Sequence, residues 1–325
     1  MRVVCLLSGE HPSLPAAELD CAVRVEETGP QVAVGECADT SRLLRLALTH
    51  RVYEYIADCP ATDDAVDAMV RDAALEPEGT FAFRVKKVEG AAIATPALAL
   101  ERRLGGMIPG RVSLSAPETT YGLVCSADRC YLGRLVCEPD RRAMDARRPF
   151  SRPFFHPGVM MPRMARTLVN LSGVEPGEVL LDPFAGTGGT LIEASLIGVR
   201  PLGFDIDPLM LWGSRLNLPG AEVALADAAH LPLGSASVDA VVSDLPYGQS
   251  VQIRGETLDR LYDESLAEVA RVLKPGRRAV IVTHRPIGEI AARHLTVVDR
   301  FEQRVHKSLT RRILVVERPA EPAAE

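Results

Sequence analysis

The chain has 325 residues, enough for two domains of ordinary size, and 47% of them are hydrophobic, which allows a substantial core. Its formal net charge of −6 excludes a uniformly basic nucleic-acid-binding protein, although a local basic patch is compatible with it. No stretch approaches the ~20 apolar residues of a membrane span, and the start of the chain lacks a signal-peptide pattern. We therefore expect a cytoplasmic protein that does not contact a membrane.

The cysteine pattern limits the chemistry further. Seven cysteines are present, an odd number, and none of them is spaced as CxxC or lies beside a histidine cluster. This pattern argues against a structural zinc site and against a disulfide framework. We therefore expect small buried thiols and no bound metal.

The part before residue 141 shows a mixture of strand and helix patterns. The amphipathic spacing of Ser41–Ala57 predicts a helix with Ser41 as its candidate N-cap, and Pro96–Ile108 predicts a second helix. Strands are expected over Met1–Ser8, Phe81–Val88, Tyr121–Val124 and Cys130–Cys137, the last two joined by a turn at Ser126–Arg129. The sequence thus predicts a mixed α/β region over residues 1–140.

An arginine-rich segment follows this region. Residues 141–166 contain seven arginines and four prolines but a single acidic residue, Asp145. We interpret residues 141–160 as a linker that leads into a helix beginning near Pro162. Arginine binds phosphate in a bidentate manner, so the cluster is a candidate nucleic-acid contact, while a solvated linker is the plain alternative. The candidate residues are Arg141, Arg142, Arg147, Arg148 and Arg152.

The next part of the chain, residues 161–318, alternates regularly between strand and helix patterns. Strands are expected over Glu178–Asp182, Pro201–Asp205, Glu222–Leu225, Val238–Ser243 and Arg278–Thr283, with helices at about 188–197, 207–217 and 258–273. This alternation predicts an α/β fold with a doubly wound, Rossmann-like sheet, which two later strands over Leu295–Phe301 and Arg311–Glu317 would close. Residues 319–325 are expected to form a disordered tail.

A glycine-rich turn, Asp182–Thr190, lies between the first of these strands and the next helix. Glycines in such a turn let a ligand approach the backbone closely. Leu191 stands where a dinucleotide fingerprint has its third glycine, and the lysine of a phosphate-binding loop is absent, so neither ligand is expected. A tight turn without a ligand is the plain alternative. The candidate cofactor-binding residues are Asp182, Phe184, Gly186 and Gly188.

Acidic residues at the next two strand ends complete the candidate cofactor site. Asp205 can accept hydrogen bonds from both ribose hydroxyls of a nucleoside. Asp207 is more simply explained as the N-cap of the following helix. Asp227, which precedes Ala228, can accept a hydrogen bond from an adenine amino group, with a capping role in its loop as the alternative.

The segment Asp244-Leu245-Pro246-Tyr247-Gly248 follows the fourth predicted strand. An amino group on a nucleic-acid base is a poor nucleophile because its lone pair is delocalised into the ring. The carboxylate of Asp244 and the carbonyl of Leu245 can accept its two N–H protons, which frees the lone pair for attack on a methyl sulfonium. Pro246 fixes the backbone path, and Tyr247 offers a flat face on which a flipped base can stack. The lone histidines His156, His284 and His306 are expected to be structural.

These residues resemble the motifs of the amino-group methyltransferases, whose hallmark is Asp/Asn-Pro-Pro-Tyr, although Leu245 replaces the commoner proline. The wider chain is similar to the archaeal tRNA guanine-N2 methyltransferases that act at position ten of tRNA. The matching segments are Arg45–Tyr55, Tyr131–Arg148, Arg152–Arg166, Asp182–Thr190, Asp244–Gly248 and His306–Ile313. The resemblance implies S-adenosylmethionine as the cofactor, tRNA as the partner and a tRNA-binding THUMP domain within residues 1–140.

The resemblance also implies the reaction, which is methylation of the exocyclic N2 amine of a guanosine in tRNA to N2-methyl- or N2,N2-dimethylguanosine. A monomer is favoured, and the arginine cluster would contact the tRNA. Two alternatives stay open from the residues. One is an N6-adenine or N4-cytosine methyltransferase of rRNA or DNA, since the same turn serves those amines. The other is a catalytically silent RNA-binding protein, against which the intact Asp244 and Tyr247 argue.

Overall fold

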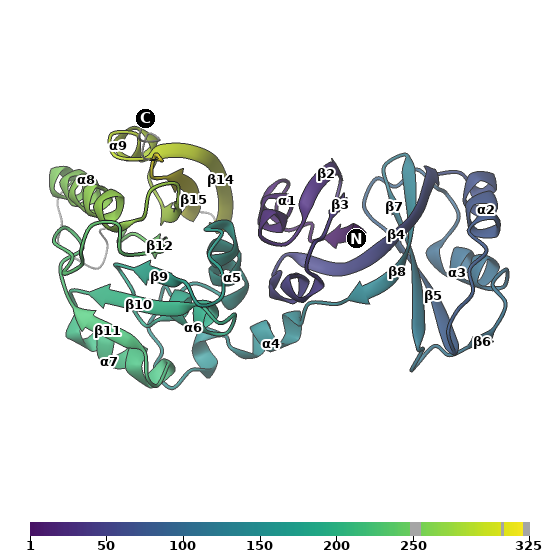
Figure 1. The fold of residues 1–325 in the computed structure, drawn as a ribbon, viewed down its shortest axis with the longest axis horizontal. Coiled ribbons are helices and arrows are strands. Elements are labelled where there is room, and N and C mark those ends of the chain that lie inside the picture. Colours follow the sequence, from purple (N-terminus) through teal and green to yellow (C-terminus); the bar gives the residue numbers. More distant parts are fainter. Residues whose placement is uncertain (248–254, 307–308, 321–325) are drawn as a thin grey trace, which may run out of the picture. The chain divides into compact units, whose positions relative to one another are not determined.

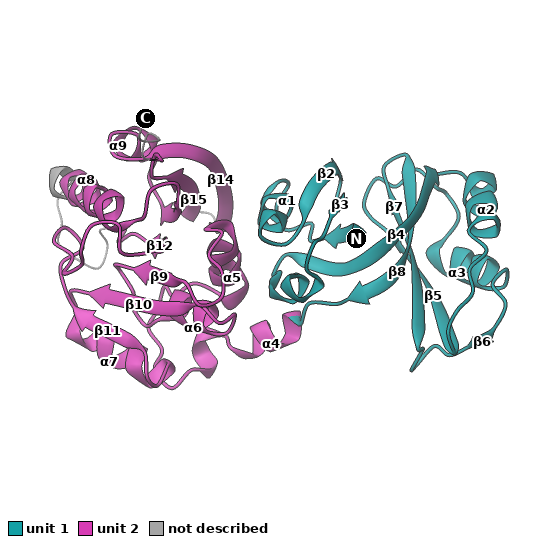
Figure 2. Ribbon diagram, in the orientation of Figure 1, with its two compact units in different colours: residues 1–140 teal, residues 141–325 magenta. Residues whose placement is uncertain are grey.

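The computed structural model describes residues 1–247, 255–306 and 309–320. The chain divides into two compact units, Met1–Asp140 and Arg141–Glu325 (Figure 2). Each unit has its own sheet and its own clusters of buried hydrophobic residues. Within the described ranges, no helix combines the length and the apolar character needed to cross a membrane.

The first unit is built on an eight-stranded sheet with the order β2-β3-β1-β4-β8-β7-β5-β6 (Figure 1). Its strands are β1 (Arg2–Leu7), β2 (Arg24–Gly29), β3 (Val32–Glu36), β4 (Thr49–Pro60), β5 (Thr80–Lys87), β6 (Arg111–Val112), β7 (Thr119–Ser126) and β8 (Arg129–Cys137). Its α-helices are α1 (Leu14–Glu18), α2 (Asp63–Asp72) and α3 (Ala97–Gly105), and 3-10 turns lie at Leu19–Cys21 and Thr40–Arg45. The helices α2 and α3 pack on β4 and β5 and enclose a core that includes Phe81 and Leu100.

Strand β4 occupies most of the segment for which the sequence pattern predicts a helix. The prediction of a helix over Ser41–Ala57 is wrong, because a 3-10 turn precedes a strand that begins at Thr49. This strand lies inside the sheet, paired with β1 and β8, where β-branched and aromatic side chains are favoured. Such residues make up five of its first eight positions: Thr49, Val52, Tyr53, Tyr55 and Ile56. Asp39, and not Ser41, caps the turn, since its carboxylate accepts the Ser41 backbone N–H at 2.9 Å.

The other predicted elements of this unit are confirmed. Strands β1, β5, β7 and β8 and helix α3 match the predicted segments to within a few residues. The expectation of buried thiols is confirmed as well, since the seven cysteines form no disulfide and six of them are buried. Burial raises the pKa of both Cys59 and Cys137 to about 11, so these thiols stay protonated and unreactive near neutral pH.

The second unit contains a sheet with the strand order β11-β10-β9-β12-β13-β15-β14 (Figure 1). Its strands are β9 (Val179–Asp182), β10 (Arg200–Asp205), β11 (Glu222–Leu225), β12 (Ala240–Asp244), β13 (Arg278–Thr283), β14 (Thr296–His306) and β15 (Leu309–Glu317). Its helices are α4 (Arg141–Ala146), α5 (Pro162–Leu171), α6 (Gly189–Ser195), α7 (Pro208–Asn217), α8 (Gly255–Val272) and α9 (Gly288–Ala291), with a 3-10 turn at Pro149–Ser151. The predicted doubly wound sheet is confirmed, and β14 and β15 form an antiparallel hairpin beside β13.

The strand order places a reversal of direction between β9 and β12. The chain runs outward from β9 through β10 to β11 and then returns, so that β12 pairs with the other side of β9. Ligands of such sheets bind outside the carboxyl ends of the strands at this reversal. Strands β9, β10 and β12 end at Asp182, Asp205 and Asp244. The fold therefore gathers the three acids predicted from the sequence at one edge of the sheet.

The arginine-rich segment is folded as a part of the second unit. Helix α4 packs against α5, and both are tied to α6 through Glu193, which is 0% exposed. Arg147 donates to both carboxylate oxygens of Glu193 at 3.0 Å, and Arg166 lies 2.8 Å from one of them. The buried Glu193 carboxylate therefore binds both Arg147, which precedes residues 148–165, and Arg166, which follows them. Of the expected tail, residues 321–325 lie outside the described part of the chain.

Candidate active site

Asp182 fastens the glycine-rich turn to the neighbouring strand. It is 3% exposed, and its Oδ1 accepts hydrogen bonds from the Ser243 hydroxyl at 2.8 Å and from the Phe184 N–H at 3.1 Å. Burial raises the pKa of Asp182 to about 7, although these two hydrogen bonds act in the opposite direction. The Phe184 side chain packs against the main hydrophobic cluster of the second unit, which includes Leu181, Val241 and Leu266. These partners indicate that Asp182 positions the turn against β12.

Two glycines of this turn have left-handed backbone conformations. The φ angle is 51° at Gly186 and 80° at Gly188. A Cβ on Gly188 would lie 2.5 Å from the Ser214 hydroxyl oxygen on α7, so helix packing requires glycine there. A Cβ on Gly186 would meet only the Phe184 carbonyl oxygen, at 4.0 Å, so this part of the backbone borders open space. A ligand can therefore approach the chain closely at Gly186.

Asp205 ties the end of β10 to the same turn. Its Oδ2 accepts the Gly186 N–H at 2.8 Å, and its Oδ1 accepts the Asp207 N–H at 2.9 Å. Burial raises the pKa of Asp205 above its ordinary value. Because each carboxylate oxygen can accept two hydrogen bonds, Asp205 keeps acceptor capacity for a pair of hydroxyls. Asp207 caps α7 by accepting the Leu209 N–H at 2.8 Å, which confirms its structural interpretation.

Ile206, an apolar residue that was not predicted from the sequence as part of the site, lies between Asp205 and Asp207. Ile206 is 70% exposed although it directly follows a strand of the sheet. At the end of the adjacent strand, Ala228 is buried, and Asp227 accepts the Ala229 N–H at 2.9 Å, which is the capping role expected as the alternative. An exposed aliphatic residue next to a strand-end acid suits the flat face of a purine. Its position directly after Asp205 was the feature of the sequence that could have identified Ile206 as a contact for the purine.

The turn after β12 brings Asp244 and Tyr247 into direct contact. The Tyr247 hydroxyl donates to Asp244 Oδ1 at 2.7 Å. Burial raises the pKa of Asp244 to about 6, against the lowering effect of that hydrogen bond and of the nearby charge of Arg311. Burial and the Asp244 carboxylate both raise the pKa of Tyr247, so its hydroxyl stays protonated as the donor. The Tyr247 ring also contacts the His284 ring, with centroids 4.9 Å apart.

The backbone of this turn is fixed by two further hydrogen bonds. The Leu245 N–H donates to the Val282 carbonyl on β13 at 2.9 Å, and the Tyr262 hydroxyl donates to the Pro246 carbonyl at 2.6 Å. Leu245 is buried and belongs to the main hydrophobic cluster, so its side chain anchors the turn in place of the commoner proline. Gly248 lies outside the described residues.

The predicted arginine cluster does not form one uniform surface. Arg147 is bound to Glu193, and half-buried Arg152 donates to the Arg147 carbonyl at 3.1 Å. Arg142 is exposed, and the Arg148 side chain is 53% exposed, with its guanidinium 3.7 Å from Asp145. The structure therefore gives Arg147 a carboxylate partner and holds Arg152 through Nε, with both terminal nitrogens of Arg152 buried and unpartnered, whereas Arg142 and Arg148 are accessible.

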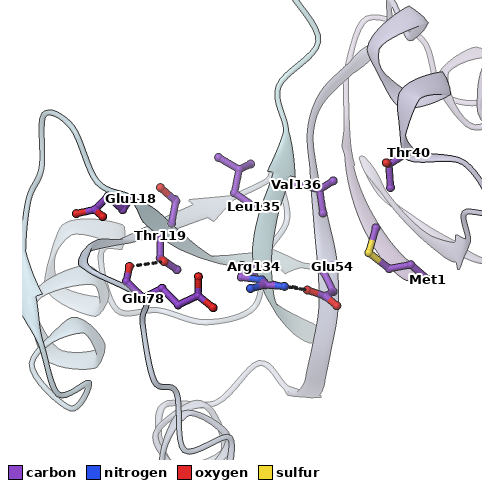
Figure 3. A pocket seen from close by; sticks show the side chains of 10 residues that line it. Met1, Thr40, Glu54, Glu78, Glu118, Thr119, Arg134, Leu135 and Val136 are labelled. Carbon is purple, nitrogen blue, oxygen red and sulfur yellow. Dashed lines mark hydrogen bonds and ion pairs between the residues drawn. The ribbon is translucent and has the colours of Figure 1, made fainter.

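A hollow of about 350 Å³ in the first unit has a different chemical character (Figure 3). Its lining includes Glu54, Glu78 and Glu118 but a single cationic side chain, Arg134. Arg134 already donates to Glu54 in two hydrogen bonds of 2.8 and 3.1 Å. A surplus of carboxylates repels phosphate, so we expect no contact with an RNA backbone in this hollow.

Comparison with known proteins explains why these motifs occur together. Residues 149–313 match the family model described as an RMKL-like methyltransferase domain. The chain is 37% identical to the tRNA (guanine(10)-N2)-dimethyltransferase of Methanothermobacter thermautotrophicus, and the match covers 98% of this chain and 100% of that protein. The chain belongs to the archaeal tRNA (guanine(10)-N2)-dimethyltransferase family.

A second relative agrees with this assignment to the dimethyltransferase family, and a solved structure shares the fold. The tRNA (guanine(10)-N2)-dimethyltransferase of Pyrococcus abyssi is 32% identical, over 90% of this chain and 91% of its own length. The crystal structure of TrmN from Thermus thermophilus superposes with a TM-score of 0.55 at 20% identity, and the match covers 98% of this chain and 100% of that one. The likeness to TrmN shows that the fold is shared over both units.

Proposed function

We propose that this chain uses S-adenosylmethionine to methylate the exocyclic N2 amine of the guanosine at position ten of tRNA, giving N2-methyl- and N2,N2-dimethylguanosine. The observation that carries the proposal is the Asp244–Tyr247 turn at the reversal between β9 and β12, beside a turn whose Gly186 borders open space. The base and its position are supported by the name of the Methanothermobacter thermautotrophicus relative, a dimethyltransferase of that guanine.

The residues at the carboxyl ends of β9, β10 and β11 fit this cofactor. Asp205 has the remaining acceptor capacity for both ribose hydroxyls, Ile206 offers an apolar face to the adenine ring, and Asp227 offers an acceptor to the adenine amino group. Gly186 leaves room for the methionine part beside the turn, and Gly188 lets the turn pack closely on α7. When bound, S-adenosylmethionine supplies a methyl group on a positively charged sulfur, so the chemistry requires no metal ion.

The side chains of the Asp244–Tyr247 turn prepare the target amine. Oδ1 of Asp244 already accepts the Tyr247 hydroxyl, so Oδ2 is the atom that accepts one N–H of the amine. The Leu245 carbonyl accepts the second N–H, which draws the nitrogen toward tetrahedral geometry and withdraws its lone pair from the ring. With a pKa of about 6, Asp244 is ionised at neutral pH and can still take up the proton that the nitrogen loses. The Tyr247 ring provides the surface on which the flipped base stacks.

For the substrate, we propose that residues 1–140 contain a THUMP-type domain that binds tRNA. Among the predicted arginines, the accessible Arg142 and Arg148 are the ones we assign to phosphate contacts. Arg147 instead stabilises the second unit through Glu193, and Arg152 is held inside the unit by the hydrogen bond of its Nε. A tRNA substrate agrees with the expected site of action in the cytoplasm.

The test is methyl transfer from labelled S-adenosylmethionine to unmodified tRNA transcripts, followed by identification of the nucleosides by mass spectrometry. We expect N2-methylguanosine and then N2,N2-dimethylguanosine, and neither product when adenosine replaces the guanosine at position ten. The variant Asp244→Ala should lower the rate about 100- to 10,000-fold, while calorimetric titration shows unchanged cofactor binding. Label in N6-methyladenosine or N4-methylcytosine would support the alternative methyltransferase. Absence of cofactor binding would support a silent RNA-binding protein.

A further inference from the structure

Three polar side chains, one beside Tyr247 and two on the β14–β15 hairpin, carry buried atoms that lack a hydrogen-bond partner. These atoms are Nδ1 of His284, Oε1 of Gln303 and Nε of Arg311. Leaving a buried donor or acceptor unpaired costs free energy, so such groups in a folded protein call for an explanation. Three of them in one place indicate a site that is completed by a polar ligand.

Strand pairing places these side chains together. Gln303 on β14 and Arg311 on β15 are directly opposite each other in the hairpin, so their side chains share one face of the sheet. The β13–β15 pairing ends with Thr283 opposite Arg312, so position 284 comes level with Arg311. His284 contacts the Tyr247 ring from there.

Arg311 contacts the amine-binding turn. Its side chain is hydrogen-bonded to Tyr247, and its positive charge lowers the pKa values of both Asp244 and Tyr247. The next residue, Arg312, differs because it donates to the His284 carbonyl and is paired with Glu302. Arg311 is therefore the arginine of this strand that is oriented toward the amine-binding turn.

The two side chains of the hairpin supply one donor and one acceptor. Arginine can only donate, and a glutamine Oε1 can only accept. Guanine presents an N1–H donor and an O6 acceptor beside its N2 amine, whereas adenine presents an N1 acceptor and an amino donor. On the basis of the proposed function, we propose that Gln303 and Arg311 read the target base, with Gln303 Oε1 accepting from N1–H and Arg311 donating to O6. These contacts would select guanosine and hold its N2 amine against Asp244.

Modified bases that keep the reacting amine test this assignment. Transcripts of the same tRNA would carry guanosine, 2-aminopurine or 2,6-diaminopurine at position ten, all of which have an amine at C2. 2-Aminopurine lacks O6 and the N1–H, and 2,6-diaminopurine has a donor in place of O6. The full-length protein should prefer guanosine over both analogues by about 5- to 150-fold in kcat/KM, the range expected for a good bidentate base contact.

Substitutions in the hairpin should abolish that preference without abolishing methyl transfer to 2-aminopurine. At about pH 8.5, where Asp244 stays ionised even without the charge of Arg311, Arg311→Met and Gln303→Leu should bring the guanosine rate down toward the 2-aminopurine rate, which should itself change little. Arg311→Lys keeps the charge but loses the planar fork, and it should restore part of the preference. Gln303→Glu keeps an acceptor opposite N1–H, and it should restore more of the preference than Gln303→Leu does.

Arg304→Ala is the matched control, because Arg304 is exposed and is the residue after Gln303 on the same strand. It should change the rates on the three transcripts by the same factor. The inference is overturned if wild type does not discriminate among the three bases, or if Arg311→Met lowers all three rates equally while thermal unfolding and cofactor titration remain normal. Failure of wild type to methylate the guanosine transcript would instead reject the proposed function.

Discussion

Removal of the Tyr247 hydroxyl should shift the pH dependence of methyl transfer to higher pH. In the wild-type protein this hydroxyl donates to Asp244 Oδ1 at 2.7 Å and lowers the pKa of a carboxyl group that burial has raised to about 6. Tyr247→Phe keeps the aromatic ring for base stacking and deletes the donor alone. The carboxylate then loses a stabilising partner, so its pKa must rise further above the ordinary value for Asp.

The size of the shift follows from the strength of that hydrogen bond. A hydrogen bond to a charged group contributes about 1.5–3 kcal/mol, and one pKa unit corresponds to about 1.4 kcal/mol. Because water can replace part of the lost interaction, we expect a shift of about one unit, to a pKa of about 7. Near pH 6.5 the ionised fraction of Asp244 would fall roughly threefold, and above about pH 8.5 wild type and variant would nearly coincide.

Single-turnover methyl transfer to tRNA, measured from roughly pH 5 to 9 with saturating cofactor, gives the midpoint directly. Tyr262→Phe is the matched control, because the Tyr262 hydroxyl donates to the Pro246 carbonyl of the same turn at 2.6 Å. This control should leave the midpoint in place even if the rate falls. A midpoint for Tyr247→Phe that stays at the wild-type value or moves to lower pH would refute the assignment of Asp244 as the proton acceptor.

Three further substitutions test other parts of the structure. Glu193→Ala should lower the free energy of unfolding by about 3–5 kcal/mol in thermal denaturation, because it removes the carboxylate that compensates the charge of buried Arg166. Glu222→Ala, which removes an exposed ion pair, should change it little. Asp182→Asn should stabilise the fold by up to about 4 kcal/mol at pH 8 and by almost nothing below about pH 4. The pKa of Asp182 is about 7 in the folded protein, so ionisation of its carboxyl group destabilises the wild-type fold as the pH rises from about 4 to above 7. Equal gains at both pH values would contradict this. Arg148→Ala should lower the slope of log tRNA affinity against log salt by about one unit, and an unchanged slope would remove Arg148 from the phosphate contacts.

The cofactor and amine-binding residues at the carboxyl ends of the strands could be predicted from the sequence, because they lie on short local motifs. Parallel strands present their carboxyl ends at one edge, so Asp182, Asp205 and Asp244, each after an apolar run, had to meet there. The glycines of the first turn have positive φ angles, as a close approach to the backbone requires. Local composition was sufficient in these places because each residue acts at the end of its own strand.

The remainder of the site depends on pairings that no local pattern carries. Gln303 and Arg311 are brought opposite each other by the register of an antiparallel hairpin beside β13. The sequence around Arg147 does not distinguish it from a solvated arginine, because its partner Glu193 lies on α6 and contacts it only in the folded unit. Ser41–Ala57 has the spacing of an amphipathic helix, and its position inside the first sheet decides the conformation in favour of a strand.

The carboxylate of Glu193 also bears on how genes of this kind can recombine. Fusion of a different RNA-recognition module at residue 160 would discard Arg147 and leave Glu193 with fewer compensating charges. Fusion just before Arg141 would transfer the complete set. Residues 141–160, whose composition suggests a replaceable linker, should therefore be inherited together with the methyltransferase sheet. Its loss would act at α6, directly behind the cofactor turn, although no residue of α4 belongs to that turn.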